Sequence, residues 1–101
     1  MKRSEPVSIA EVLRQAIEES DLSDRLAETR AAAAWPSVVG PSIAALTGKP
    51  LVDRGVMTVV CRSASLRQEL SMQRSLLVRM LNRAARAEAI SELRFRGGGD
   101  S

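Results

Sequence analysis

Residues 51–61 have the sequence LVDRGVMTVVC, and this stretch decides the fold because it has the pattern of a β-hairpin. Two apolar segments, Leu51-Val52 and Val56–Cys61, are separated by the turn Asp53-Arg54-Gly55. Glycine adopts the positive φ that a tight turn of this kind requires. We therefore expect two paired strands here.

The second of these strands places Val56, Thr58 and Val60 on one face, because successive side chains alternate across a strand. If that face is covered, it is ordinary core. If it is open, it is an apolar patch suited to a partner.

Two further elements are expected after the hairpin. The segment Ser65–Ala87 has the pattern of one long amphipathic helix. Its apolar side chains gather on one side of a helical wheel: Leu66, Leu70, Leu77, Met80, Leu81 and Ala84. The alternation in Ile90–Arg96 predicts a strand with Leu93 and Phe95 on one face. Gly97–Ser101 is expected to be a flexible tail.

The segment before the hairpin begins with the best-specified helix, Ser8–Ser20. Ser8 and Glu11 have capping-box spacing, and Val7 and Val12 occupy the two positions of a hydrophobic staple. The apolar stripe of this helix consists of Ile9, Val12, Leu13, Ala16 and Ile17.

A second helix is expected to start at Asp21 or Ser23 and to run through Ala31–Ala34, where helix propensity is highest. Pro36 disfavours the helical conformation for Trp35, so this helix should end or kink there. A short third helix would begin at Pro41.

The order helix, helix, short helix, strand, strand, helix, strand predicts a two-layer α+β fold with helices on one face of a three-stranded sheet. A chain of 101 residues supports one modest core, so residues 1–96 should form a single domain. Trp35 and Phe95 are the only aromatic residues, which makes that core mostly aliphatic.

The composition argues against an enzyme. Histidine and tyrosine are absent, which removes His-based general bases and His-based metal sites. No glycine-rich phosphate loop follows a strand, and the acidic residues of positions 1–30 fit solvated helix faces. Cys61 has no base beside it and fits a core position. We expect no cofactor, no metal and no small-molecule substrate.

The sequence also predicts a soluble, cytoplasmic protein. Met1–Val7 leads directly into an amphipathic stretch, which is unlike a signal peptide. No apolar run approaches the ~20 residues of a membrane span. The single cysteine excludes an intramolecular disulfide and fits a reducing compartment.

Charge is distributed unevenly along the chain. Residues 1–30 carry five basic and seven acidic side chains, whereas residues 62–96 carry eight arginines against three glutamates, a net charge of +5. This asymmetry favours a polyanionic partner for the second half, although a GC-rich genome would also enrich arginine. The candidate nucleic-acid-binding residues are Arg62, Arg67, Arg74, Arg79, Arg83, Arg86, Arg94 and Arg96.

Each candidate has a plainer interpretation. Arg79, Arg83 and Arg86 lie opposite the apolar side of their predicted helix, where they could follow a phosphate backbone or form a solvated face. Arg94 and Arg96 share the polar face of the last strand, where they could contact phosphates or provide solubility. Trp35 is the candidate partner-binding residue, since tryptophan is enriched at binding hot spots, but it is also the largest candidate for the core.

The stretch from Trp35 to Phe95 resembles a known family. The residues that carry the resemblance are Trp35, Val38-Val39-Gly40, Ile43-Ala44, Thr47, Met57-Thr58-Val59, Ser63, Leu66-Arg67-Gln68-Glu69-Leu70, Leu76-Leu77, Leu81-Asn82, Ile90 and Leu93-Arg94-Phe95. Their order and spacing are similar to those of the DciA family, formerly a domain of unknown function. The resemblance implies a KH-like domain that binds the bacterial replicative DNA helicase, assists its loading, and has affinity for single-stranded DNA or RNA.

Two features depart from that pattern. A KH domain clamps the nucleic-acid backbone with a GxxG loop, and no such motif occurs here between helices. Many relatives carry a long flexible extension, whereas here the tail is Gly97–Ser101. A KH-like RNA-binding module in RNA metabolism or ribosome function is the alternative, and the missing GxxG weighs against it.

Overall fold

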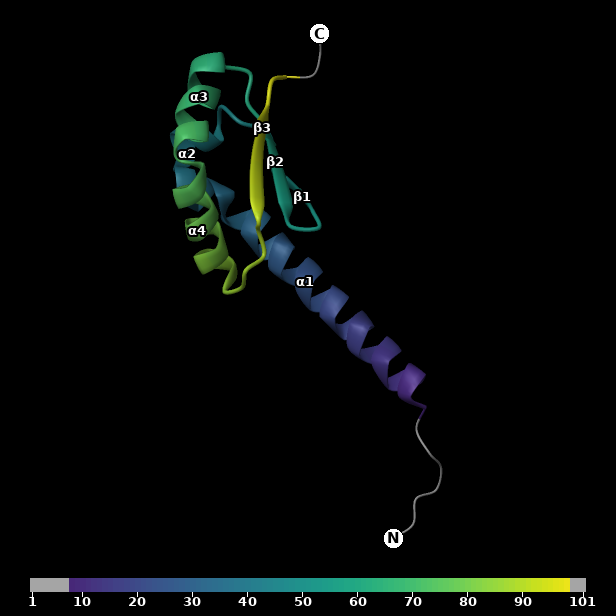
Figure 1. Ribbon diagram of the computed structural model, residues 1–101. Coiled ribbons are helices and arrows are strands. Elements are labelled where there is room, and N and C mark those ends of the chain that lie inside the picture. Colours follow the sequence, from purple (N-terminus) through teal and green to yellow (C-terminus); the bar gives the residue numbers. More distant parts are fainter. Residues whose placement is uncertain (1–7, 99–101) are drawn as a thin grey trace.

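A computed structural model describes residues 8–98 and places helices on one side of a three-stranded sheet (Figure 1). Val7 of the predicted staple and residues 99–101 of the predicted tail lie outside the described residues. The elements in chain order are α1 (Ile9–Val39), α2 (Pro41–Ala44), β1 (Leu51–Asp53), β2 (Val56–Val60), α3 (Ala64–Met72), α4 (Arg74–Ala85) and β3 (Glu92–Arg96).

The sheet has the order β1-β2-β3 and is mixed. Strands β1 and β2 are antiparallel, whereas β2 and β3 are parallel, so α3 and α4 form the crossover that a parallel pair needs. Met57 in the central strand lies between Val52 and Leu93. This arrangement confirms the predicted two-layer α+β class and its β-β-α-β order.

The hairpin turn consists of Arg54 and Gly55, because Asp53 is already paired with Val56. Arg54 has φ 52° and Gly55 has φ 85°. Positive φ at both central residues is the requirement of the type I′ turn, whose twist matches that of the paired strands. The positive φ expected for Gly55 is confirmed.

Helix α1 corrects the prediction of two separate N-terminal helices. It continues without a break through Asp21 and Ser23, which resemble caps but lie on its exposed surface. Pro36 removes one backbone donor without ending the helix, which continues to Val39. Trp35 and Ala31 are buried in the core and hold this part of the helix against the sheet.

The predicted helix Ser65–Ala87 is divided in two. Gln73, with φ −108° and ψ 17°, ends α3 and precedes α4. The break redirects the chain, so that α3 contacts β3 while α4 lies along α1. It also changes which residues are covered: Asn82 and Ala85 are buried, whereas Met80 and Ala84, assigned to the apolar side by the wheel, are exposed.

The core is built between α1, α4 and the inner face of the sheet. Its largest fully buried side chains are Trp35, Met57, Leu81, Leu93, Val59 and Cys61. The indole Nε1 of Trp35 donates a hydrogen bond to Thr47 Oγ1 at 3.0 Å. Phe95 completes the aromatic content of this region, with its ring centroid 6.2 Å from that of Trp35.

The other face of the sheet is open. Leu51 is 69% exposed and Val60 is 37% exposed, while Val56 and Thr58 are half-buried. Figure 1 shows the helices on the opposite side of the sheet. Of the two possibilities for Val56, Thr58 and Val60, the structure therefore supports the open face.

The first half of α1 extends well beyond the rest of the molecule (Figure 1). The molecule measures 67 × 29 × 19 Å, with a radius of gyration of 18.5 Å. A globular chain of about 100 residues has a radius of gyration near 13 Å. The difference reflects this protruding helix.

Candidate functional site

The outer surface of α4 carries the most concentrated basic charge. Arg79 and Arg83 are exposed and lie opposite the buried Leu77 and Leu81, as the wheel predicted. Arg86 ends the helix in the left-handed conformation and is also exposed. Helix α4 contains no acidic residue, so no carboxylate of the same helix offsets the charge of these arginines.

Arg67 has a structural role. It is half-buried, and its Nη1 donates a hydrogen bond to the carbonyl oxygen of Cys61 at 2.7 Å. This bond joins α3 to the end of β2. Arg62 is exposed, and Gly98 lies directly against its side chain. These two arginines therefore lie near the C-terminal end of the sheet, away from the middle of α4.

Arg94 and Arg96 lie on the open face of the sheet. The Arg94 guanidinium donates a hydrogen bond from Nε to Glu92 Oε2 at 2.6 Å. This hydrogen bond, with the attraction of the same carboxylate, raises the pKa of Arg94 above its ordinary value. Glu92 pairs with Arg94 on this face, so strand β3 contributes a net charge of only +1 to it.

The eight candidate arginines consequently do not form one surface. Arg79, Arg83 and Arg86 face away from the sheet on α4, and Arg74 is exposed at the start of the same helix. Arg94 and Arg96 project from the other side of the sheet. The structure thus divides the candidate arginines between a helix face and a sheet face.

The assignment of Trp35 as a partner-binding residue needs correction. Its side chain is 1% exposed and its only polar atom is hydrogen-bonded to Thr47. An indole held in this way contributes to the core and cannot contact a partner in this conformation. Cys61 is also fully buried, in agreement with its predicted core position.

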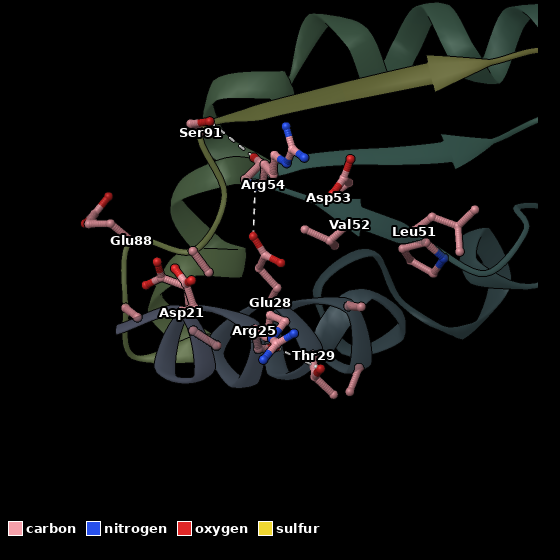
Figure 2. A pocket seen from close by; sticks show the side chains of 18 of the residues that line it. Asp21, Arg25, Glu28, Thr29, Leu51, Val52, Asp53, Arg54, Glu88 and Ser91 are labelled. Carbon is pink, nitrogen blue, oxygen red and sulfur yellow. Dashed lines mark hydrogen bonds between the residues drawn. The ribbon is translucent and has the colours of Figure 1, made fainter. Parts of the chain in front are cut away.

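A groove of about 1340 Å³ lies between the middle of α1, the hairpin and the loop before β3 (Figure 2). Figure 2 shows Glu28 extending from α1 toward the hairpin turn, where its Oε2 accepts a hydrogen bond from the Gly55 backbone N–H at 2.8 Å. The acidic residues lining the groove are Asp21, Asp24, Glu28, Asp53 and Glu88, against the basic Arg25, Lys49 and Arg54. An acidic lining does not suit nucleic acid.

The turn between α3 and α4 is where this helix pair would carry a backbone clamp. Gln73 alone separates the two helices, between Met72 and Arg74, and none of these residues is glycine. A GxxG loop lets a nucleic-acid backbone approach the main chain closely. This turn therefore lacks the GxxG clamp.

Sequence reasoning did not identify three residues that join distant segments. Glu28 and Arg30 connect α1 to the hairpin and to the end of α4, where Arg30 Nε donates to the Ala85 carbonyl at 3.0 Å. Asn82 is the third, and its only sequence signal is a polar residue among the apolar positions of its helix. Glu28 and Arg30 have no such signal, because each resembles an ordinary exposed helix residue.

A family model described as "Dna[CI] antecedent, DciA" matches residues 8–95. The chain belongs to the DciA family. The match runs from the start of α1 into β3, so it includes the protruding half of α1 as well as the folded body. DciA membership relates the protein to loading of the replicative helicase, as the resemblance implied. A comparison with curated proteins finds no match.

Across the described helices of this DciA protein, none is long and apolar enough to cross a membrane.

Proposed function

We propose that this DciA protein is a non-enzymatic, cytoplasmic accessory factor of DNA replication that binds the replicative helicase and, weakly, single-stranded nucleic acid. The observation that supports this function is the family match over residues 8–95. In this proposal, the protein assists loading by holding helicase and single strand together.

We propose the outer face of α4 as the nucleic-acid surface. Arg79, Arg83 and Arg86 are exposed, and no acidic residue of the same helix opposes them. The open sheet face is less favourable because Glu92 pairs with Arg94. Among the described residues, the only two aromatic side chains are the buried Trp35 and the half-buried Phe95, so base stacking contributes little. Binding then depends on phosphate contacts and is weak at physiological salt.

The test is a fluorescence-anisotropy titration of a labelled single-stranded oligonucleotide. The triple variant Arg79→Glu, Arg83→Glu and Arg86→Glu changes the net charge of the chain from +3 to about −3. The matched control is Arg25→Glu, Lys49→Glu and Arg54→Glu, which gives the same net charge but alters residues that line the groove.

We expect the α4 variant to lose affinity for every oligonucleotide sequence, because phosphate contacts carry no base information. The control should retain most of the affinity. For the wild type, log affinity should fall with log salt by about 0.7 for each phosphate contacted. Equal affinity losses in the two variants would show that only overall charge matters and would remove α4 as the surface.

Helicase binding is tested separately by pull-down with the purified replicative helicase, with and without nuclease. The proposal predicts capture of the helicase in both conditions, because the protein contact does not require nucleic acid. Capture that disappears with nuclease would mean that nucleic acid alone bridges the two proteins.

A further inference from the structure

The protruding half of α1, residues 9–26, carries an apolar stripe that no other described residue covers. Ile9 is 76% exposed, Leu13 56% and Ile17 60%. Positions seven residues apart lie on nearly the same side of a helix. The row of Leu13 therefore continues through Ser20 to Ala27, which is buried in the body. The exposed stripe is the extension of the face that α1 uses for folding.

None of the other described residues covers this stripe. Residues 9–26 continue α1 without a break, and their N-terminal part extends away from the sheet and from α4 (Figure 1). At 1.5 Å per residue this segment is about 27 Å long. Another chain can supply the covering surface.

Charge beside the stripe defines what that surface must carry. Residues 8–26 contain five acidic and two basic side chains, a net charge of −3. Arg14 is paired with Glu11 and Glu18. Glu19 and Asp24 follow Val12 and Ile17 by seven residues and so adjoin the stripe. A complementary surface is apolar along its middle and basic along its edge.

The outer face of α4 has this character. Leu76 is 45% exposed and Met80 is 40% exposed, one helical turn apart. Arg79 and Arg83 lie beside them at the three- and four-residue spacings that bring helical side chains together. The segment 74–86 carries four arginines and no acid, a net charge of +4. Two α1 segments facing each other would instead bring together two net charges of −3.

We propose that the protruding half of α1 binds the outer face of α4 in a second copy of this chain. The contact is heterologous, because the two surfaces differ, so it builds a ring or an open chain of subunits. It does not depend on nucleic-acid binding by α4, and it stands if the oligonucleotide titration above fails.

Sedimentation velocity of the full chain tests the proposal. The weight-average mass of the wild type should rise above 10.9 kDa between about 5 and 200 μM, since one helix pair is a small interface with micromolar affinity at best. Two charge variants follow: an α1 variant, Glu19→Lys, Asp21→Lys and Asp24→Lys, and the α4 variant Arg79→Glu, Arg83→Glu and Arg86→Glu. Each should weaken association at least about tenfold, because it places like charges in contact.

A mixture of the α1 variant and the α4 variant is the decisive experiment. In each contact between the two proteins, the α1 segment and the α4 face then carry opposite charges, so association should return to the wild-type level. Self-association of the α4 variant alone would overturn the proposal in favour of α1 pairing with α1. A wild type that stays at 10.9 kDa throughout would also overturn it, and would assign the stripe to a different protein.

A variant of the apolar stripe separates the contribution of its apolar side chains to association from that of the charged residues. Leu13→Ser with Ile17→Ser should abolish association and leave thermal unfolding unchanged, because both side chains are more than half exposed. Association that survives this variant would exclude the stripe from the contact.

Discussion

Asn82 and Ile90 exchange two hydrogen bonds in the buried interior. The Asn82 Nδ2 donates to the Ile90 carbonyl oxygen at 2.9 Å, and the Ile90 N–H donates to Asn82 Oδ1 at 2.7 Å. A side-chain amide thus pairs with the backbone as a neighbouring strand would. The two bonds attach the start of the β3 segment to α4, and they explain why a polar residue is buried among leucines.

Asn82→Leu should therefore destabilise the protein by about 2–5 kcal/mol, because two buried backbone groups of Ile90 lose their partner. The measurement is the free energy of unfolding in urea. Gln68→Leu is the matched control, since Gln68 is exposed on α3 and should change stability by less than about 0.5 kcal/mol. Similar losses for the two variants would contradict this role of Asn82.

Gly55→Val should cost about 1 kcal/mol or more, because a β-branched residue resists positive φ. A Cβ at Gly55 would also come within 3.0 Å of Ser91 Oγ. A second comparison uses alanine at two glycines. Gly40 also has a positive φ of 92°, but nothing lies within 4 Å of its Cβ position. Gly40→Ala therefore introduces backbone strain alone, whereas Gly55→Ala introduces strain and crowding. Gly55→Ala should show the larger decrease in melting temperature.

Thr47→Val should destabilise the core although it preserves the shape of the side chain. Thr47 Oγ1 accepts the indole hydrogen bond of Trp35, and an unpartnered buried donor costs about 1–3 kcal/mol. Thr58→Val on the open sheet face makes the same chemical change at a half-buried site and should be nearly neutral. Chemical denaturation of both variants measures the difference, and equal stabilities would exclude a contribution from this hydrogen bond.

Reversal of the open-face arginines, Arg94→Glu with Arg96→Glu, should affect single-strand affinity less than an equal reversal of Arg79 and Arg83. Glu92 already neutralises Arg94, so fewer free positive charges are lost. Anisotropy titrations of the two double variants compare the faces at the same net charge. A greater loss for the sheet variant would move the proposed surface to the open face.

Single-stranded DNA and a second copy of the chain should compete, since both are proposed to bind the outer face of α4. Addition of a saturating oligonucleotide should lower the sedimentation mass of the protein itself toward the 10.9 kDa of the monomer. Oligonucleotide that leaves the association unchanged would mean that the two ligands use different surfaces.

Local patterns in the sequence predicted most of the elements, because capping, alternation and turn chemistry involve neighbouring residues. They failed where local signals are ambiguous: Asp21 and Ser23 suit both a helix cap and an exposed helix surface. The break at Gln73 has no glycine or proline to mark it.

The candidate site was predicted less completely than the fold. The wheel placed Arg79 and Arg83 correctly on the outside of their helix. It could not show that Arg67 bonds the Cys61 carbonyl oxygen just after β2. That contact depends on where two separate elements meet in space, and no period in the sequence contains that information. Glu92 and Arg94 are two residues apart on one face of β3, so alternation places them together, but it does not show that their side chains pair.

The continuity of α1 has a consequence for how this protein holds its partners. Residues 9–39 form one helix whose second half is packed in the core. Any molecule that binds the first half therefore also sets the direction in which the sheet and α4 point. Each residue of a helix adds 1.5 Å of length and about 100° of rotation. One residue inserted between the two halves would turn the apolar stripe of the protruding half to another side. The number of residues in the protruding half, and not only their chemistry, therefore determines which way the sheet and α4 face when the stripe is bound.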